Sequence, residues 1–413
     1  MDENGQIPLT PSLALDGIRV LEVADWIAGP YAGSLLADFG AQVIIVERPD
    51  GLSGTRQLGG LREGDADRSP YFYVFARNKQ SIILDFTTEQ GRNLLLRLVE
   101  QVDVVISSFR PGTLERHGLG WDDLSTRNPK VVLLEISGFG QSGPLRESAG
   151  FDRVAQAFGG LTYVTGHAEM PPTRAGFGVV DYISGLYGAF GVMVALEERR
   201  RSGRGQRIDH ALYESLLPMQ LDIPVRYVLD GTIHERSGNY FPGYAPGEAF
   251  KSADGAWVHV SATGDPAFRA LMKAIGRDDL ANASEYASMP LRDERRDELH
   301  VILRNWVGER TVDEVEGVLR PAGAAVSRIQ NIQDVMSHPH VQERGDFDLF
   351  EHPQFGDVPA VAPLPKLMRT PGTIRSGGPE LGANTLDVLT DLLGVSYEDA
   401  ERLAFETSRG KPE

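Results

Sequence analysis

Cysteine is absent from this chain of 413 residues. Without a thiol, the protein has no disulfide, no thiolate metal ligand and no cysteine nucleophile. The sequence also lacks a run of 18 or more apolar residues, and its polar N-terminus, residues 1–11, has no signal-peptide core. These absences predict a cytoplasmic protein with no membrane partner.

Positive charge is scarce, because 41 Lys and Arg stand against 58 Asp and Glu and give a net charge of −17. This balance disfavours nucleic acid as the main partner. An anionic ligand needs a local group of Arg or Lys to offset the overall negative field. The hydrophobic content of 41% is typical of a soluble globular protein, and the length allows two domains with sizeable cores.

Several catalytic and binding motifs are also missing. Residues 24–33 after the first apolar strand lack G-x-G-x-x-G, and Pro30 there removes an N–H that a pyrophosphate would use. Glu47, at the end of the next strand, resembles a ribose-binding acid but is interpreted as a solvated residue. The segment Ser137-Gly-Phe-Gly lacks the G-x-S-x-G serine elbow and is predicted to be a close-approach loop. The nine histidines are scattered, so no metal site is predicted.

The first half of the chain alternates apolar strands with helical or turn-rich segments. The predicted strands cover residues 18–23, 42–47, 80–85, 103–107 and 130–136, and the predicted helices cover 31–39 and 88–101. This alternation predicts an α/β domain with a parallel, Rossmann-like sheet covered on both faces. The polar stretch 48–69 is predicted to be a surface loop near a ligand.

The composition changes near residue 225. Residues 231–246 are rich in Gly, Pro and aromatic residues, 256–262 alternate as a strand does, and 265–319 read as helical and charged. We predict a large α/β domain over residues 1–224 and a smaller α+β domain over 225–330. A C-terminal segment over 331–413, with a strand at 347–350 and a helix at 385–393, is predicted to return to the large domain.

One carboxylate stands at the start of a long apolar segment, in Gly176-Phe-Gly-Val-Val-Asp181-Tyr-Ile-Ser-Gly185. The apolar residues that follow Asp181 have helical spacing and alternate with small Gly and Ala, up to the charged run 197–201. Position alone favours an ordinary helix N-cap for Asp181. The alternative is a nucleophilic carboxylate that the helix dipole keeps ionised.

Arginines follow several predicted strands. Arg48 comes after the second strand and Arg110 after the fourth, with Arg116 close behind. The carboxyl ends of strands in an α/β sheet face the ligand crevice, so these three side chains are candidates to converge on phosphates. Each one alone is interpreted as a solvated or ion-paired surface residue.

Taken in order, these segments resemble the family III CoA-transferases (CaiB/BaiF family), which include formyl-CoA transferase, carnitine CoA-transferases and acyl-CoA racemases. The resemblance covers residues 13–225 and continues more weakly to the end. The matching segments are Leu15-Asp-Gly-Ile-Arg-Val-Leu-Glu, Ala28-Gly-Pro, Leu36-Ala-Asp-Phe-Gly-Ala-Gln-Val-Ile-Ile-Val-Glu-Arg48, Asn78-Lys-Gln-Ser-Ile-Ile-Leu-Asp85, Phe109-Arg-Pro-Gly112, Gly138-Phe-Gly140 and Ser202-Gly-Arg-Gly-Gln-Arg207.

The resemblance implies an enzyme that moves CoA from an acyl-CoA donor to a small carboxylic acid, with Asp181 as the nucleophile. The intermediates are an aspartyl mixed anhydride and an aspartyl-CoA thioester, and CoA is a substrate rather than a bound cofactor. The implied CoA contacts are Trp26, Ile27, Ala28, Arg48, Leu84, Ser108, Phe109 and Arg116. Formyl-CoA transferase has Asn where Ser108 stands. The resemblance also implies an interlocked, ring-like homodimer.

The acyl-CoA racemases of this fold pair the aspartate with a histidine in a Gly-His-Asp segment. The matching segment here is Gly150-Phe151-Asp152, and a phenyl ring carries no proton, so the transferase is favoured over the racemase. Whether His167 reaches Asp181 is open. A third alternative is a protein that is not an enzyme and in which Asp181 only caps its helix.

The acyl pocket is predicted to be bulky and aromatic. The predicted pocket residues are Phe151, Asp152, Tyr240, Phe241 and Tyr244, the last three in a loop where formyl-CoA transferase has consecutive glycines. Packing of a linker is an equal alternative for these three aromatic residues. Arg77, Arg174 and Arg226 are candidates to hold a second carboxylate of a dicarboxylic acid, with surface ion pairs as the alternative.

Overall fold

The computed structural model describes residues 13–57, 59, 69–352 and 356–408. The chain forms two compact units. Unit 1 comprises residues 1–159, 176–221 and 343–413, and unit 2 comprises 160–175 and 222–342. The domain boundaries predicted from the sequence, after residues 224 and 330, stay predictions.

Unit 1 contains a six-stranded sheet in its described part, and every neighbouring pair of strands is parallel. The order is β3-β2-β1-β4-β5-β6. The strands are β1 (Arg19–Val23), β2 (Gln42–Glu47), β3 (Lys79–Ile83), β4 (Val104–Ser107), β5 (Val132–Ser137) and β6 (Arg207–Ala211). This sheet confirms the predicted α/β fold.

The strand order reverses between β1 and β4, because the chain proceeds from β1 to β3 on one side and from β4 to β6 on the other. Parallel sheets bind ligands at the carboxyl ends of the strands next to such a switch point. The loop that follows β1 begins at Ala24, and the loop that follows β4 begins at Ser108. Two segments with predicted CoA contacts therefore meet at the switch point.

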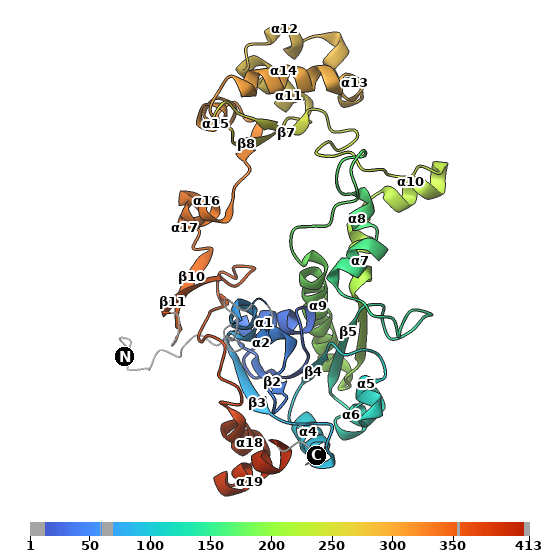
Figure 1. The fold of residues 1–413 in the computed structure, drawn as a ribbon, viewed down its shortest axis with the longest axis vertical. Coiled ribbons are helices and arrows are strands. Elements are labelled where there is room, and N and C mark those ends of the chain that lie inside the picture. The colour runs from blue at the N-terminus through green and yellow to red at the C-terminus, as the bar shows by residue number, and fades with distance from the viewer. Residues whose placement is uncertain (1–12, 58, 60–68, 353–355, 409–413) are drawn as a thin grey trace. The chain divides into compact units, whose positions relative to one another are not determined.

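Helices cover both faces of the sheet, as neighbouring residues of β5 show. Leu133 belongs to the core cluster that includes α4 (Glu89–Val99) and α18 (Thr385–Leu393). Leu134 points the other way, toward Gly188 of α9 (Val179–Ser202), which packs extensively on α1 (Ala28–Asp38). Figure 1 shows α1 and α9 on one side of the sheet and α4 and α18 on the other.

Unit 1 contains further short elements, and most of them were not predicted from the sequence. They are α2 (Gly54–Gln57), α3 (Pro70–Ala76), α5 (Thr113–Arg116), α6 (Trp121–Arg127), α7 (Asp152–Phe158), the 3₁₀ segment η1 (Leu212–Gln220), the hairpin β10 (Phe347–His352) and β11 (Gly356–Val361), and α19 (Tyr397–Ser408). In the C-terminal segment, α18 contacts β3 and its Leu389 is buried in the core beside α4. The end of the chain thus completes one face of the sheet.

Unit 2 contains an antiparallel sheet of order β7-β8-β9 and several short helices. Val258 and Val260 of β8 are buried in its core, whereas Trp257 and His259, which alternate with them, are exposed, as the sequence predicted. Its elements are α8 (Leu161–Val164), α10 (Ile223–Asp230), β7 (Gly247–Lys251), β8 (Trp257–Ser261), α11 (Asp265–Ala274), α12 (Asp278–Ala281), η2 (Ser284–Tyr286), α13 (Met289–Glu294), α14 (Arg296–Gly308), α15 (Val312–Leu319), β9 (Ala325–Arg328), α16 (Ile332–Ser337) and α17 (Pro339–Glu343).

Helix α9 is the one described helix whose length and apolar composition would allow it to cross a membrane. The same properties are found in core helices of soluble folds, so this is weak evidence for a membrane span. Here 44% of the apolar stretch is buried inside the fold. The burial arises from small residues such as Gly185 and Gly188, which face α1 and β5.

Candidate active site

Asp181 lies in the first turn of α9, whose N-cap position is occupied by Gly178. The interpretation of Asp181 as the N-cap is therefore wrong. The capping acceptor comes instead from the buried Asp152 at the start of α7, whose Oδ1 accepts a hydrogen bond from the Val180 N–H at 2.8 Å. The Asp181 N–H lies 3.4 Å from the same oxygen. A carboxylate from another helix thus satisfies the start of α9, which leaves the Asp181 side chain unused as a cap.

The Asp181 carboxyl has an altered proton affinity. Burial, followed by the neighbouring charge of Asp152, raises the pKa of Asp181 to about 7. In the described part of the chain, no cation and no hydrogen bond lowers this pKa. At neutral pH the group is therefore partly ionised and more basic than an ordinary carboxylate, which suits a nucleophile.

Close packing of α9 on α1 brings the nucleophile candidate to the β1 loop. A methyl group on Gly185 would lie 2.8 Å from the Ala28 carbonyl oxygen and 2.8 Å from the Tyr31 ring. Only glycine permits this approach of the two helices. Gly185 is one helical turn after Asp181, so the packing holds the start of α9 near Ala28, a predicted CoA contact.

Aromatic side chains surround this region. The Tyr182 ring lies 5.0 Å from Tyr31 and 6.0 Å from Phe75, and burial raises the pKa of Tyr182 to about 12. Trp26 and Phe151 meet edge to face at 5.7 Å, and 48% and 52% of their surfaces stay exposed. Phe151 directly precedes the capping residue of α9. The Trp26–Phe151 pair is therefore an accessible apolar wall between the β1 loop and the start of α7.

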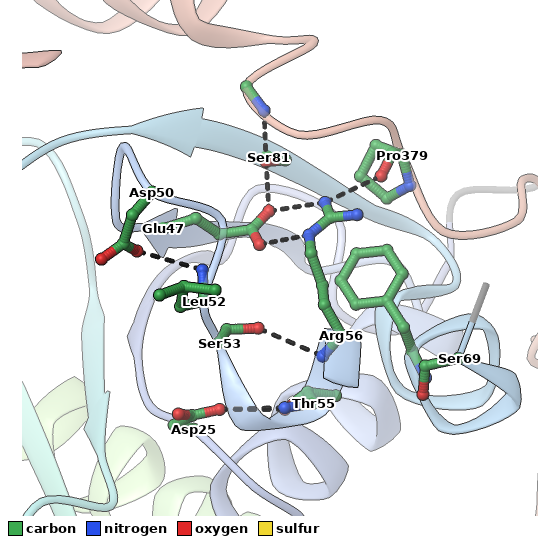
Figure 2. Close-up of polar contacts among 12 residues, drawn as sticks. Asp25, Glu47, Asp50, Leu52, Ser53, Thr55, Arg56, Ser69, Ser81 and Pro379 are labelled. Carbon is green, nitrogen blue, oxygen red and sulfur yellow. Dashed lines mark hydrogen bonds and ion pairs between the residues drawn. The ribbon is translucent and has the colours of Figure 1, made fainter. Parts of the chain in front are cut away.

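The β1 loop is fixed by hydrogen bonds from two other segments. Ser108 at the end of β4 donates to the Asp25 carbonyl oxygen and accepts from the Asp25 N–H, both at 2.8 Å. The Asp25 carboxylate accepts from the N–H group of Gly54 at 2.9 Å. It also accepts from the N–H group of Thr55 at 3.1 Å, as Figure 2 shows. Thr55 Oγ1 also donates to the Trp26 carbonyl oxygen. The Ser108 hydroxyl thus holds the loop in place. No pattern in the sequence indicates this role for Ser108 or the roles of Asp25 and Thr55.

A buried ion pair joins β2 to α2, the helix that contacts the β1 loop. Glu47 is 3% exposed and accepts from Arg56 Nε at 2.5 Å and Nη2 at 2.7 Å, as Figure 2 shows. Ser81 donates to the same carboxylate, and Arg56 also donates to the Pro379 carbonyl oxygen at 3.0 Å. The prediction of a solvated Glu47 is therefore wrong. The prediction of a surface loop over 48–69 is wrong for α2, which is buried at Thr55 and Arg56, while residues 58 and 60–68 lie outside the described residues.

The other predicted CoA contacts differ in their surroundings. Arg48 is exposed and pairs with Asp50 at 2.5 Å. Leu84 is 1% exposed and belongs to the core, so its side chain has little surface for a ligand. Phe109 packs against Phe86 with ring centroids 5.9 Å apart.

Arg116 lines two neighbouring cavities. The first, of about 570 Å³, is lined by Arg110, Pro111, Gly112, Glu115, Arg116, Gln141, Arg146, Glu147 and Arg207. The second, of about 960 Å³, is lined by Phe86, Thr87, Thr88, Glu89, Gln90, Arg92, Arg116, His117, Phe405 and Glu406. Of the three arginines expected to converge, Arg110 and Arg116 share a cavity, and Arg48 lines neither. Arg146 and Arg92 had no signal in the sequence beyond their charge.

The predicted pocket residues do not all belong to one unit. Tyr240, Phe241 and Tyr244 lie in unit 2, where the Tyr240 hydroxyl donates to Asp293 and the Phe241 and Tyr244 rings are 5.0 Å apart. His167 also belongs to unit 2, and its ring lies against Gly238. The assignment of these side chains to the acyl pocket stays a prediction.

Two of the three arginines considered for a second carboxylate are already paired. Arg77 is buried, and it donates to Asp38 through Nε at 3.0 Å and Nη2 at 2.5 Å. Arg226 pairs with Asp222, four residues earlier on α10. Arg174 is exposed and donates to the neighbouring Ala175 carbonyl oxygen. The surface ion-pair alternative is therefore correct for Arg226, whereas Arg77 forms a buried ion pair with Asp38. Among the described residues, no group of three His, Asp or Glu is placed to hold a metal ion.

The fold is that of the CaiB/BaiF proteins. A CaiB/BaiF family protein from Brucella suis superposes with a TM-score of 0.81 at 32% identity, over 92% of this chain and all of the other. The family model for CoA-transferase family III matches residues 15–385. The chain therefore belongs to CoA-transferase family III, as its motifs predicted.

Two relatives with assigned reactions show the class of enzyme. The succinyl-CoA–D-citramalate CoA-transferase of Chloroflexus aurantiacus is 38% identical over 95% of this chain and 97% of its own length. The succinate–glutarate CoA-transferase of Agrobacterium fabrum is 33% identical over 92% of this chain and 95% of its own length. The prediction of an acyl-CoA:carboxylate CoA-transferase is confirmed at this level.

Proposed function

We propose that this enzyme transfers CoA through covalent intermediates on Asp181. The observation that carries the proposal is the Asp181 carboxyl itself, which is half-buried at the start of α9 and whose pKa is raised to about 7. A carboxylate of raised basicity, partly shielded from water and held by its helix, is suited to attack a thioester carbonyl. Asp152 supplies the capping acceptor of α9, so the Asp181 side chain is not needed to cap the helix.

The transfer consists of four acyl substitutions. Ionised Asp181 attacks the donor thioester carbonyl, the C–S bond breaks, and a mixed anhydride and CoA thiolate form. The thiolate then attacks the aspartyl carbonyl, which releases the donor acid as a carboxylate and leaves aspartyl-CoA thioester. The acceptor carboxylate attacks this thioester and expels CoA thiolate again. The thiolate finally attacks the acceptor acyl carbonyl, which gives the new acyl-CoA and free Asp181.

The local structure supports a place for the thioester between the β1 loop and α9. The Trp26–Ala28 loop is fixed at the switch point by Ser108 and by α2, and Ala28 packs against Gly185 just after the nucleophile. Arg110 and Arg116 line a cavity at the end of β4, which suits phosphate groups of CoA. CoA therefore binds as a substrate along the carboxyl ends of the strands. A cytoplasmic location stays a prediction.

The acids that this enzyme uses include a dicarboxylate, since the relatives are named for reactions of succinyl-CoA or succinate. The test is a screen in which the protein is incubated with succinyl-CoA or acetyl-CoA and with citramalate, malate, glutarate, branched or aromatic acids. We expect a new acyl-CoA, detected by chromatography and mass spectrometry, with succinyl-CoA as the donor. Exchange of the α-proton without any acceptor would instead indicate the racemase, against which Phe151 argues. If neither a new acyl-CoA nor α-proton exchange is detected, the result contradicts an enzymatic function.

We also propose a homodimer. Leu186, Phe190 and Val194 are spaced four residues apart on α9, and each is more than half exposed. Three such residues form one apolar stripe along the helix, which an isolated chain would leave in water. Light scattering is expected to give twice the chain mass of 45.2 kDa. A mass of one chain at micromolar concentration would contradict the dimer.

A further inference from the structure

We propose that Asp152 is a positioning residue that both caps the nucleophile's helix and places a second negative charge beside Asp181. The inference rests on the proposed function, because it assigns a role beside the same nucleophile. In this arrangement one carboxylate performs two tasks. Its oxygen acceptor orders the first turn of α9, and its charge keeps the neighbouring carboxylate basic.

The capping geometry is the first support. Asp152 Oδ1 accepts from the Val180 N–H at 2.8 Å, and Oδ2 accepts from Gln156 Nε2 at 2.6 Å. The side chain is 9% exposed, so water screens it little. Gly178 occupies the N-cap position and has no side chain that could replace this acceptor. The start of α9 therefore depends on Asp152 for a hydrogen bond that most helices supply locally.

The second support is the closeness of the two carboxylates. A methyl group placed on Gly178 would lie 3.6 Å from Asp181 Oδ2 and 3.8 Å from Asp152 Oδ1. The two oxygens are therefore within roughly 7 Å of each other, where like charges in a partly buried site interact appreciably. Because Gly178 has no side chain, nothing from this residue fills the space between them. The negative charge of Asp152 opposes ionisation of Asp181 and makes the ionised form a stronger base.

Other charged groups near α9 do not take over this role. Burial and Asp152 are the causes of the raised pKa of Asp181. The causes of this shift do not include the other titratable side chains on the elements that pack against α9. These are Tyr31 and Asp38 on α1, Arg153 on α7, Glu135 on β5, Arg207, Asp209 and His210 on β6, and Tyr213 and Glu214 on η1. Glu135 pairs with Arg207, and burial lowers the pKa of His210, so its ring is neutral near pH 7. Asp152 is therefore the one described charge that tunes the nucleophile.

The two tasks of Asp152 can be separated by substitution. Asp152→Asn keeps an oxygen for the Val180 N–H but removes the charge, whereas Asp152→Ala removes both. Asp123→Asn is the matched control, because Asp123 caps α6 through the Gly120 N–H at 3.0 Å and lies on another helix. The pKa of Asp181 is read without any substrate, from the difference in melting temperature between each protein and its Asp181→Asn derivative across pH 4–9.

The sign of this difference follows from the raised pKa. An acid with a higher pKa in the folded state loses stability as the pH rises from its unfolded pKa to its folded pKa. The melting temperature of the unsubstituted protein is therefore expected to fall relative to Asp181→Asn from about pH 4 and to level off above about pH 7. In the Asp152→Asn background, we expect the levelling to occur about one pH unit lower. Asp123→Asn is expected to leave it unchanged.

The second readout is the pH profile of hydroxylamine trapping on Asp181 after addition of acyl-CoA. We expect Asp152→Asn to move the acid limb to lower pH and to slow trapping several-fold at pH 8, since the nucleophile is less basic. A purely structural role would lower the rate at every pH without moving the limb. If the pH at which the melting-temperature difference levels off is unchanged in the Asp152→Asn background, the inference is overturned. Absence of trapping in the unsubstituted protein, by contrast, would overturn the transferase mechanism while the thermal titration still decides the role of Asp152.

Discussion

Asp181→Asn is expected to abolish CoA transfer, with a loss of at least about a thousandfold in kcat. An amide does not attack a thioester, so neither the anhydride nor the aspartyl-CoA thioester forms, and hydroxylamine labelling of residue 181 disappears. Steady-state assays and mass spectrometry of tryptic peptides measure the two effects. Retention of transfer above about one per cent would contradict the nucleophile assignment.

The same substitution is expected to stabilise the fold at alkaline pH. The pKa of Asp181 is raised from 3.8 to about 7, so at pH 8 the folded protein holds a partly buried negative charge that the unfolded chain holds in water. At about 1.4 kcal/mol per pKa unit, its removal raises the free energy of unfolding by about 2–4 kcal/mol at pH 8 and by little at pH 4. This result separates loss of chemistry from loss of folding. Asp123→Asn serves as the control, since it is expected to leave transfer unchanged.

Arg56→Ala is expected to lower the free energy of unfolding by about 3–5 kcal/mol, because it leaves Glu47 buried without its cation. The two side chains are 5% and 1% exposed, and Arg56 also holds the Pro379 carbonyl oxygen. The N–H groups at the start of α2 donate to Asp25, and Thr55 of α2 donates to the Trp26 carbonyl oxygen. Because these bonds position the predicted CoA-binding loop, we also expect a higher KM for the acyl-CoA. Urea denaturation and steady-state kinetics give the two values.

The matched control for Arg56→Ala is Arg127→Ala. Arg127 pairs with Glu100 at 3.4 Å, but both side chains are exposed, so the expected loss is below about 1 kcal/mol. Replacing both partners by Glu47→Gln and Arg56→Met is expected to recover part of the stability, because no buried charge is left unpaired. If Arg56→Ala costs no more than the control, the buried pair does not hold α2.

The strands and the main helices of unit 1 were largely predictable from local pattern. The helix at Thr385–Leu393 was predicted with its observed bounds, because its apolar periodicity and flanking residues are local signals. The 3₁₀ segment η1 after β6, with Pro218 inside it, and α19 were not predicted. Short segments of this kind depend on the surface that they pack against.

The candidate site likewise contains residues that local sequence pattern indicated and residues whose roles depend on tertiary contacts. Asp181 was recognised because it stands at the head of an apolar pattern and within ordered motifs. The role of Asp152 was not, since it depends on contact between residues 28 positions apart in the chain. Glu47 was misjudged for a similar reason: its partner Arg56 lies in a polar stretch that looks like a surface loop. A sequence states which groups are charged, whereas burial and pairing decide what each charge does.

The sequence by itself determined the family, the α/β sheet and the identity of the nucleophile candidate, because these follow from motif order, strand periodicity and the absence of cysteine. Only the tertiary structure decided that Asp181 is free of a capping role and that its pKa is raised to about 7. The physical reason is that a pKa depends on desolvation and on the distance to another charge, here Asp152. Both quantities arise only when α7 and α9 pack together.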